Sequence, residues 1–335
     1  GTTGAVLRPA VLGAHQGVPR QGEVMAKPPE SPAAEVMTVL GPVRADRLGV
    51  VLPHEHLFCN TLREYRSDGL LDDLELAVRE LRRFKAAGGG TVVELTCPTF
   101  GRRPDLLREA SDATGVHIVM GCGHYRDPYL ADADLDRRTV AQIGADLVAE
   151  FTEGVDGVRP GIIGEVGADA GWVSALEERA LRAAAWAQAR TGATISLHAA
   201  RWPVGRDILN ILAECGVPME RVVVGHLDTV NDPQFHLEVV RRGCWAEFDG
   251  FTTDVPYDTE RIAGYVARLV EAGHHARVLL SHDLFRLSHF HSYGGVGLTH
   301  LLDEVPQVLR AHGVADDVVS AMLTTNPQRA LSGMS

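Results

Sequence analysis

Two histidines, His54 and His56, close an apolar run that covers residues 48–53. Residues i and i+2 of a strand point to the same side, so both imidazoles can converge on one metal ion while Glu55 faces away from it. Two imidazoles do not make a site by themselves, because a stable metal site needs three or more ligands. The pair therefore predicts metal binding if later segments of the chain supply the remaining ligands.

Four later segments have the same form, an apolar run that ends in a histidine or a carboxylate. The residues at these ends are Glu165, His198, His226 and Asp283. A single histidine at the end of a strand is more often a hydrogen-bonded core residue than a ligand. Four histidines and two carboxylates that met without a cation would leave buried charges and donors unpaired, at a cost of roughly several kcal/mol. The set therefore predicts a metal centre at one rim of the fold.

The elements that must position these residues alternate along the chain. Apolar runs predict strands at residues 50–54, 91–95, 117–121, 161–165, 194–198, 221–225, 244–248 and 277–281. Spacing close to 3.6 residues predicts helices at 72–87, 104–113, 139–152, 175–190, 206–215, 233–242, 259–272, 298–312 and 315–323. Eight βα units in roughly 280 residues predict an α/β fold, a (β/α)₈ TIM barrel, in preference to an open doubly wound sheet. Active sites of such barrels lie at the C-terminal ends of the strands, where the six residues stand.

Composition and the remaining motifs exclude several function classes. The 335 residues are 45% hydrophobic and carry a formal net charge of -12, which disfavours a nucleic-acid partner. No uninterrupted apolar run of about 18 residues is present, which argues against a membrane span. No G-x-G-x-x-G opens a helix after the first predicted strand, so the usual dinucleotide site is not expected.

Cysteine usage and the N-terminal segment predict where the folded domain lies and in which compartment. Five scattered cysteines without a C-x-x-C spacing favour a reducing compartment, and we expect a cytoplasmic protein. Residues 1–36 contain neither a secretory signal nor a hydrophobic period. We therefore expect a flexible N-terminal extension over 1–36 and a single domain over 37–335.

Several segments, in their order and spacing, carry a resemblance to a known family. They are Pro53-His54-Glu55-His56-Leu57, Gly161-Ile-Ile-Gly-Glu165, Leu197-His198, Gly225-His226-Leu227-Asp228-Thr229, Ser281-His282-Asp283 and Thr325-Asn326-Pro327. From Met37 onwards the chain resembles the phosphotriesterase family of the amidohydrolase superfamily. Many members bridge their metals with a carboxylated lysine, and Glu165 stands at the matching position. This departure, with Ser288-His289-Phe290 and the glycines at 294–297, resembles the branch of phosphotriesterase homology proteins and phosphotriesterase-like lactonases.

The resemblance implies a centre of two divalent metal ions bridged by Glu165. His54, His56, Glu165 and Asp283 would hold the more buried ion, and Glu165, His198 and His226 the more exposed one. These ligands suit zinc, with manganese, cobalt or nickel as alternatives. A hydroxide that bridges the ions would attack the substrate, and Asp283 would accept its proton. Asp228 or His282 would relay that proton outward or serve as hydrogen-bonding neighbours.

Residues in the loops after the strands are candidates for substrate contacts. Tyr125 could donate a hydrogen bond to a substrate carbonyl, or it could be a packing lid. Gly250 stands where some lactonases of the family carry an arginine. Other residues could recognise an anionic substrate group or be exposed loop residues; these are Arg201, Trp202, Arg286, Ser288, His289 and His291.

These residues predict a metal-dependent hydrolase that attacks an ester-type bond of a small molecule, with a lactone as the leading substrate. The alternatives are an organophosphate triester and an N-acyl amino acid. A non-enzyme alternative is a barrel that keeps its metal for structure and acts as a binding protein. Asp283 argues against that alternative, because a purely structural site needs no carboxylate beside an open water position. The resemblance also implies a homodimer.

Overall fold

The computed structural model describes residues 1, 34–252 and 258–334, and the described residues from Ala34 onwards form one compact unit. Eight parallel strands form one sheet in the order β12-β11-β10-β9-β8-β7-β6-β3. The strands are β3 (Val50–Glu55), β6 (Gly89–Glu94), β7 (His117–Cys122), β8 (Ile162–Ala168), β9 (Ile195–Ala199), β10 (Val222–Val224), β11 (Trp245–Phe248) and β12 (Val278–Leu280). All eight predicted strands are thereby confirmed, and the sheet curls into a nearly closed (β/α)₈ barrel.

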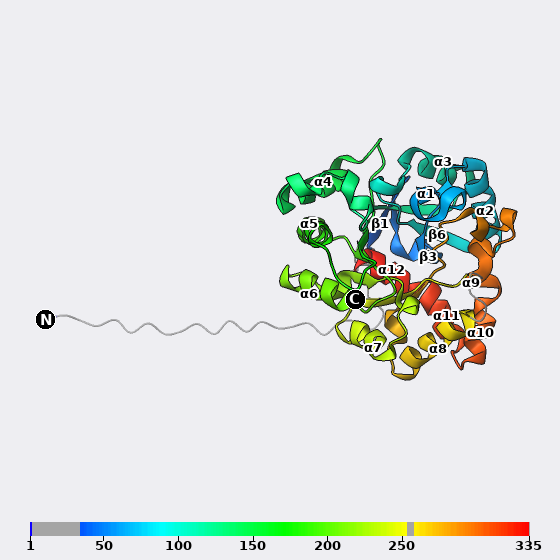
Figure 1. The fold of residues 1–335 in the computed structure, drawn as a ribbon. Coiled ribbons are helices and arrows are strands. Elements are labelled where there is room, and N and C mark those ends of the chain that lie inside the picture. The colour runs from blue at the N-terminus through cyan, green and yellow to red at the C-terminus, as the bar shows by residue number, and fades with distance from the viewer. Residues whose placement is uncertain (2–33, 253–257, 335) are drawn as a thin grey trace. The chain divides into compact units, whose positions relative to one another are not determined.

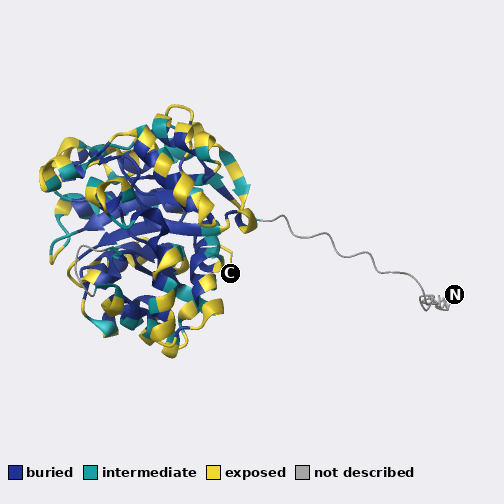
Figure 2. Cartoon of the chain, turned by 90° about the vertical axis from the view of Figure 1, so that its right-hand side faces the viewer, coloured by how far each residue is buried: buried dark blue, intermediate teal, exposed yellow. Residues whose placement is uncertain are grey.

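The helices surround this sheet and cover its outer face (Figure 1). They include α2 (Leu74–Ala86), α3 (Pro104–Thr114), α4 (Val140–Glu153), α5 (Ala175–Thr191), α6 (Gly205–Glu214), α7 (Pro233–Arg241), α8 (Asp258–Glu271) and α11 (Asp316–Leu323). Figure 2 shows buried residues filling the strands and exposed ones on the outer sides of the helices. Strands covered on both faces are largely apolar, and every residue of β8 and of β9 is buried.

The helix predicted at 298–312 is wrong as a single element. The structure has two helices there, α9 (His300–Asp303) and α10 (Val305–Ala311). Pro306 lies in the first turn of α10, where its missing N–H costs nothing, but its ring would clash with the preceding turn of a continuous helix. The hydrophobic spacing used to predict the helix did not indicate this interruption.

The boundary predicted at residue 36 also needs correction. A hairpin of β1 (Glu35–Thr38) and β2 (Gly41–Arg44) begins two residues earlier than expected, and Val36 is buried. The rest of the predicted extension, residues 2–33, lies outside the described residues. Further short elements that the sequence analysis did not anticipate are α1 (Leu62–Tyr65), β4 (Cys59–Asn60), β5 (Leu70–Leu71) and α12 (Thr325–Ser332).

The first and last barrel strands, β3 and β12, meet without a regular ladder of backbone hydrogen bonds. The hydroxyl of Ser281 accepts a hydrogen bond from the His54 amide at 3.0 Å and lies 2.8 Å from the His54 carbonyl oxygen. The Asp283 amide donates to the same carbonyl at 3.2 Å. The seam of the barrel is therefore joined by groups that belong to predicted site residues or their neighbours.

All five cysteines are free thiols, and four of them are buried. Among the described residues, no helix combines the length and the apolar character that crossing a membrane would require.

Candidate metal centre and cavity

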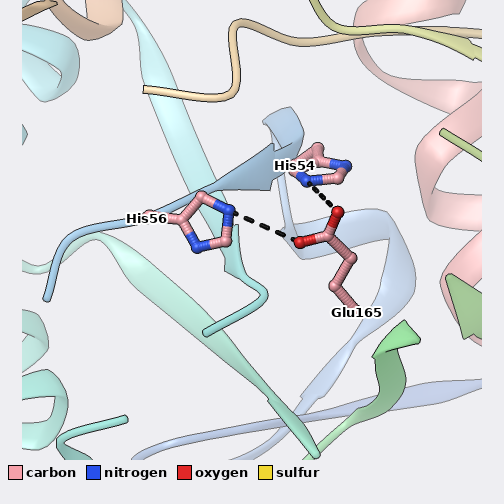
Figure 3. Close-up of side chains that lie close together, drawn as sticks. All are labelled: His54, His56 and Glu165. Atoms are coloured by element: carbon pink, nitrogen blue, oxygen red, sulfur yellow. Dashed lines mark ion pairs between the residues drawn. The ribbon is translucent and has the colours of Figure 1, made fainter. Parts of the chain in front are cut away.

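The carboxylate of Glu165 lies at the centre of the predicted ligand set. Glu165 is buried near the C-terminal end of the barrel, where it faces His54 of β3 and His56, which directly follows that strand (Figure 3). Its Oε1 lies 3.7 Å from His54 Nε2, and its Oε2 lies 3.7 Å from His56 Nε2. Each carboxylate oxygen therefore faces a different imidazole, as the i and i+2 spacing of the pair predicts.

A second group of ligand atoms gathers on the other side of Glu165. His198 Nδ1 lies 2.5 Å and His226 Nε2 lies 2.7 Å from Glu165 Oε1. The two ring nitrogens are 2.8 Å apart. Glu165 is thus shared between two sets, His54 with His56 and His198 with His226, and ligand atoms of each set lie close enough to hold one ion.

Asp283, which follows β12, completes the set. Its Oδ1 lies 3.2 Å from His56 Nε2 and 3.7 Å from His54 Nε2. Asp283 and His226 both have left-handed backbone conformations, with φ of 54° and 57°. Such angles are uncommon for residues other than glycine and occur most often at functional sites. All six predicted ligands are therefore brought together at one rim.

Carboxylates behind the histidines fix which ring nitrogen carries the proton. His54 Nδ1 donates to Glu247 Oε2 at 3.0 Å, and His226 Nδ1 donates to Asp249 Oδ1 at 2.9 Å. Because an ionised carboxylate can only accept, Nδ1 carries a proton, and Nε2 is the nitrogen left to bind a metal ion. Both acids come from the end of β11.

His56 is oriented through a hydroxyl. Thr96 Oγ1 donates to Glu94 Oε1 at 2.6 Å, so it accepts from His56 Nδ1 at 2.9 Å. The sequence analysis missed these supporting residues, although Glu94, Thr96, Glu247 and Asp249 also stand at the ends of apolar runs. Hydrogen-bonded partners of this kind raise the basicity of metal ligands and hold their rings in place.

This arrangement fits cations and fits poorly without them. His54 Nε2 is buried and has no hydrogen-bond partner among the described residues. When neutral, three of these imidazoles point lone pairs at carboxylate oxygens, which are acceptors as well, so the neutral cluster has electron pairs but few donors. Divalent cations among these atoms would satisfy all of them, and the N and O ligands suit zinc or a related ion.

The pKa values of the cluster show the same demand for positive charge. Burial disfavours a charged imidazole, but the carboxylates of Glu165 and Asp249 outweigh it and raise the pKa of His54 well above its usual value. Burial also works against ionised Asp283, yet its hydrogen bond with His56 and the charge of His54 lower the pKa of Asp283 to about 2. Protons and metal ions therefore compete for the same nitrogens.

A cavity of about 180 Å³ opens onto the metal-ligand cluster. Its lining includes the ligands His56, His198, His226 and Asp283, and further residues from the segments that follow the strands, namely Thr61, Glu64, Tyr65, Phe100, Tyr125, Arg126, Ala200, Arg201, Thr229 and Phe285. The site thus combines ligand atoms with space for a small molecule.

Tyr125 and Arg201 lie where the sequence analysis placed them, in the cavity wall. The Tyr125 ring stands edge-on to His198 with ring centres 5.0 Å apart, and burial raises the pKa of its phenol, which stays protonated. Arg201 Nη1 donates to Asp169 Oδ2 at 2.7 Å, and its side chain is 59% exposed. Arg126, which the sequence analysis missed, is buried beside them and pairs with Glu64.

The described residues that line the cavity do not include Arg286, His289 or His291, so their predicted substrate contact is not supported. Arg286 Nε lies 3.0 Å from His289 Nε2, and His291 Nδ1 lies 2.9 Å from Glu80 Oε2. Trp202 and Ser288 are also outside the lining, and Ser288 donates to Asp68. The long segment after β12 is held by contacts with the segment around α1 and α2.

Asp228 and His282, the proposed proton relay, are likewise outside the described lining. Asp228 is buried, and burial together with Asp249 raises its pKa to about 7. Its Oδ1 accepts from the amides of Asp249 and Gly250 at 3.0 and 3.2 Å. A Cβ atom at Gly250 would collide with Asp228 Oδ2, which explains a glycine at this strand end. His282 Nδ1 donates to Glu55, so these contacts favour the hydrogen-bonding role over the relay.

Comparisons with known proteins agree with this geometry. Residues 34–331 match the model of the phosphotriesterase family. The N-acetyltaurine hydrolase of Homo sapiens is 32% identical over 349 residues, covering 90% of this chain and 98% of that protein. A crystal structure of the phosphotriesterase homology protein from Escherichia coli, complexed with phosphate in its active site, is 30% identical with a TM-score of 0.82 and covers 85% of this chain and 99% of that one. The crystal structure of a lactonase from Listeria monocytogenes is 25% identical with a TM-score of 0.83, and the match covers 90% of this chain and 100% of that one.

Proposed function

The chain belongs to the phosphotriesterase family and is an enzyme, and we propose that it is a metal-dependent hydrolase of small carboxylic amides that carry an anionic group. The observation that carries this proposal is the position of Asp283. Its carboxylate belongs both to the ligand cluster and to the cavity wall. A structural metal site would have no need of an ionised carboxylate that faces a substrate-sized space.

The ligand set would hold two divalent ions, one beside His54, His56 and Asp283 and the other beside His198 and His226, with Glu165 shared. Ions bound by these residues would supply Lewis-acid chemistry, which polarises a substrate carbonyl and lowers the pKa of a water molecule. Asp283 has a pKa of about 2, so it is ionised at neutral pH and can accept the proton of the attacking water. We propose zinc as the ion, with manganese, cobalt or nickel as alternatives.

The cavity wall supplies the remaining roles. The protonated phenol of Tyr125 can donate a hydrogen bond to the carbonyl oxygen, on which negative charge develops during attack. Arg201 uses one donor for Asp169, and the other donors of its guanidinium can bind a carboxylate or sulfonate of the substrate. This arrangement and the similarity to N-acetyltaurine hydrolases favour an amide with an anionic end.

A lactone, the leading substrate in the sequence analysis, is the second candidate. The similarity to a lactonase over the whole of that chain favours it. Both reactions place negative charge on a carbonyl oxygen beside the same ligands, so the substrate's other groups must discriminate between them. An organophosphate triester would be a weaker third substrate.

The test is a substrate panel on the zinc- or manganese-loaded enzyme. It contains N-acetyltaurine, N-acetyl amino acids, γ-lactones and an organophosphate triester. We expect the anionic amides to have the highest kcat/KM, and Asp283→Asn to retain nearly all of its metal while kcat falls by roughly 10³-fold. Full activity in Asp283→Asn would refute the proton-acceptor role, and turnover of lactones alone would refute the amide proposal.

Substitution of Arg201 tests whether this residue recognises the anionic group of the substrate. Arg201→Gln should raise KM for N-acetyltaurine roughly tenfold and leave KM for a neutral lactone unchanged, because only the anion loses a charged partner. Arg137, 79% exposed at its side chain and outside the described cavity lining, offers a matched Arg→Gln control. Equal KM changes for both substrates would remove Arg201 from substrate recognition.

A further inference from the structure

We propose that Glu55, the last residue of β3, which lies between His54 and His56, positions Asp283 for proton transfer. This inference rests on the proposed role of Asp283 in the hydrolase. The carboxylate of Glu55 is fully buried and points away from the metal ligands, towards the seam between β3 and β12. It does not line the described cavity, so it acts through Asp283 and touches no substrate.

The contacts of Glu55 enclose Asp283 on both sides along the chain. Glu55 Oε1 accepts from the His282 amide at 3.0 Å and from His282 Nδ1 at 2.8 Å. Oε2 accepts from the Leu284 amide at 3.0 Å. The Ser281 hydroxyl lies 2.8 Å from Oε1 and completes the set. One side chain therefore holds the backbone immediately before and immediately after Asp283.

These hydrogen bonds of Glu55 explain how Asp283 keeps its unusual backbone conformation. Its φ of 54° is uncommon for a residue with a side chain, and such a conformation persists only where surrounding contacts hold it. Asp283 contributes one further backbone contact, from its amide to the His54 carbonyl at 3.2 Å. Since His54 and His56 are the chain neighbours of Glu55, this one residue fixes Asp283 relative to both histidines.

His282 extends the same network away from the site. With Nδ1 donating to Glu55, its Nε2 is free to accept from the Leu301 amide at 3.1 Å. The ring is fully buried, so both nitrogens need these partners. The network thus connects the segment after β12 to the first turn of α9.

Glu55→Gln keeps the size of the side chain and changes only the hydrogen bonding. One oxygen becomes an NH₂ group, which must face the Leu284 amide or the donors of His282, and either pair of donors repels. Asp283 should then shift relative to His56. A displacement of about 1 Å in a reacting group lowers turnover by roughly 10²-fold. We therefore expect kcat to fall by ~10–10²-fold, while KM and metal content stay within about threefold of the wild type.

A double-mutant cycle separates this role from loss of structure. If Glu55 acts through Asp283, Glu55→Gln should lower kcat in the wild type but change the residual kcat of Asp283→Asn by less than about threefold. Equal losses in both backgrounds would overturn the proposal. The comparison of the wild type with Asp283→Asn alone tests the proposed function. Failure of the proposed function can therefore be distinguished from failure of the proposal for Glu55.

Glu80→Gln is the matched control, because Glu80 is also a fully buried glutamate with a histidine partner, His291, and lies outside the described cavity lining. It should leave kcat within about threefold, and a loss equal to that of Glu55→Gln would overturn the proposal. If Glu55→Gln does not fold, Glu55→Asp, which keeps the charge but shortens the reach to Leu284, enters the same cycle. Crystal structures of wild type and variant give the answer without substrate: an unchanged 3.2 Å distance from Asp283 Oδ1 to His56 Nε2 would also overturn it.

Discussion

Asp249 is the buried acid that links the two halves of the metal centre, and its replacement by asparagine should weaken metal binding. Its Oδ1 accepts from His226 Nδ1 at 2.9 Å, and its Oδ2 accepts from the His226 amide at 3.0 Å. Oδ2 also lies 3.3 Å from His54 Nδ1. Asp249 therefore contacts one histidine from each of the two ligand sets that share Glu165.

The magnitude follows from the two orientations open to the asparagine. If its oxygen stays on His226 Nδ1, its NH₂ group faces the His226 amide, and a buried donor without an acceptor costs about 1–3 kcal/mol. If the amide is flipped, Nδ1 must give up its proton, which moves to Nε2, 2.7 Å from Glu165 Oε1, and removes a ligand lone pair. Loss of such a supporting hydrogen bond lowers metal affinity by roughly 10–100-fold, which corresponds to about 1.4–2.8 kcal/mol.

Competition between the protein and a chromophoric chelator for zinc would measure this change, with urea unfolding of the metal-free proteins run in parallel. Asp232→Asn provides the control, since Asp232 caps α7 by accepting from Gln234 and Phe235, and asparagine caps a helix equally well. The control should bind zinc as the wild type does. Unchanged zinc affinity in Asp249→Asn would refute the argument that these carboxylates set the tautomers of the ligands.

Three further predictions concern the metal, pH and Tyr125. If the free metal concentration is 100 times the Kd of a site, removal of the metal with a chelator should lower the free energy of unfolding by about 2.7 kcal/mol for that site. A Tm that is the same with and without metal would contradict the metal centre. Burial, reinforced by Arg138, lowers the pKa of His124 to about 4, below the usual 6.5, so the stability that its neutral ring contributes is complete above pH 6.5 and is lost as the pH falls towards 4. Between pH 7 and 4 the free energy of unfolding of His124→Gln should therefore fall less than that of the wild type, by up to roughly 3 kcal/mol in urea titrations. The same pH dependence of the unfolding free energy in both proteins would count against this assignment. Tyr125→Phe removes one hydrogen bond to the substrate and should lower kcat/KM up to about tenfold with metal content unchanged; wild-type kinetics would make Tyr125 a packing residue.

The strands and the six candidate ligands could be predicted from the sequence because both signals are local. Each barrel strand is a short apolar run, and the ligands lie among the first polar residues at or after its end. The left-handed conformations of His226 and Asp283 did not obscure this signal, because they occur after the strands have ended.

The supporting residues could not be predicted in the same way, because their partners lie far away in the sequence. Glu55 contacts residues more than 220 positions later, and nothing in the run 50–56 indicates that the seam lies beside it. The sequence shows that polar residues such as Glu247 and Asp249 stand at the ends of apolar runs. Whether such a residue binds the metal or supports a ligand depends on the order of the strands in the sheet and on how far its side chain reaches towards the centre of the site. The same reason explains why His291, close to Asp283 in sequence, pairs with Glu80 of α2 instead of reaching the cavity.

The seam between β3 and β12 has a consequence for how activity is acquired during synthesis. Residues on both of its sides supply the site, with His54 and His56 made early and Asp283 made about 230 residues later. A nascent chain therefore cannot assemble the centre until β12 has left the ribosome and docked against β3. Metal ions that bind there would link the two ends of the barrel, so closure of the fold and the start of catalysis would coincide.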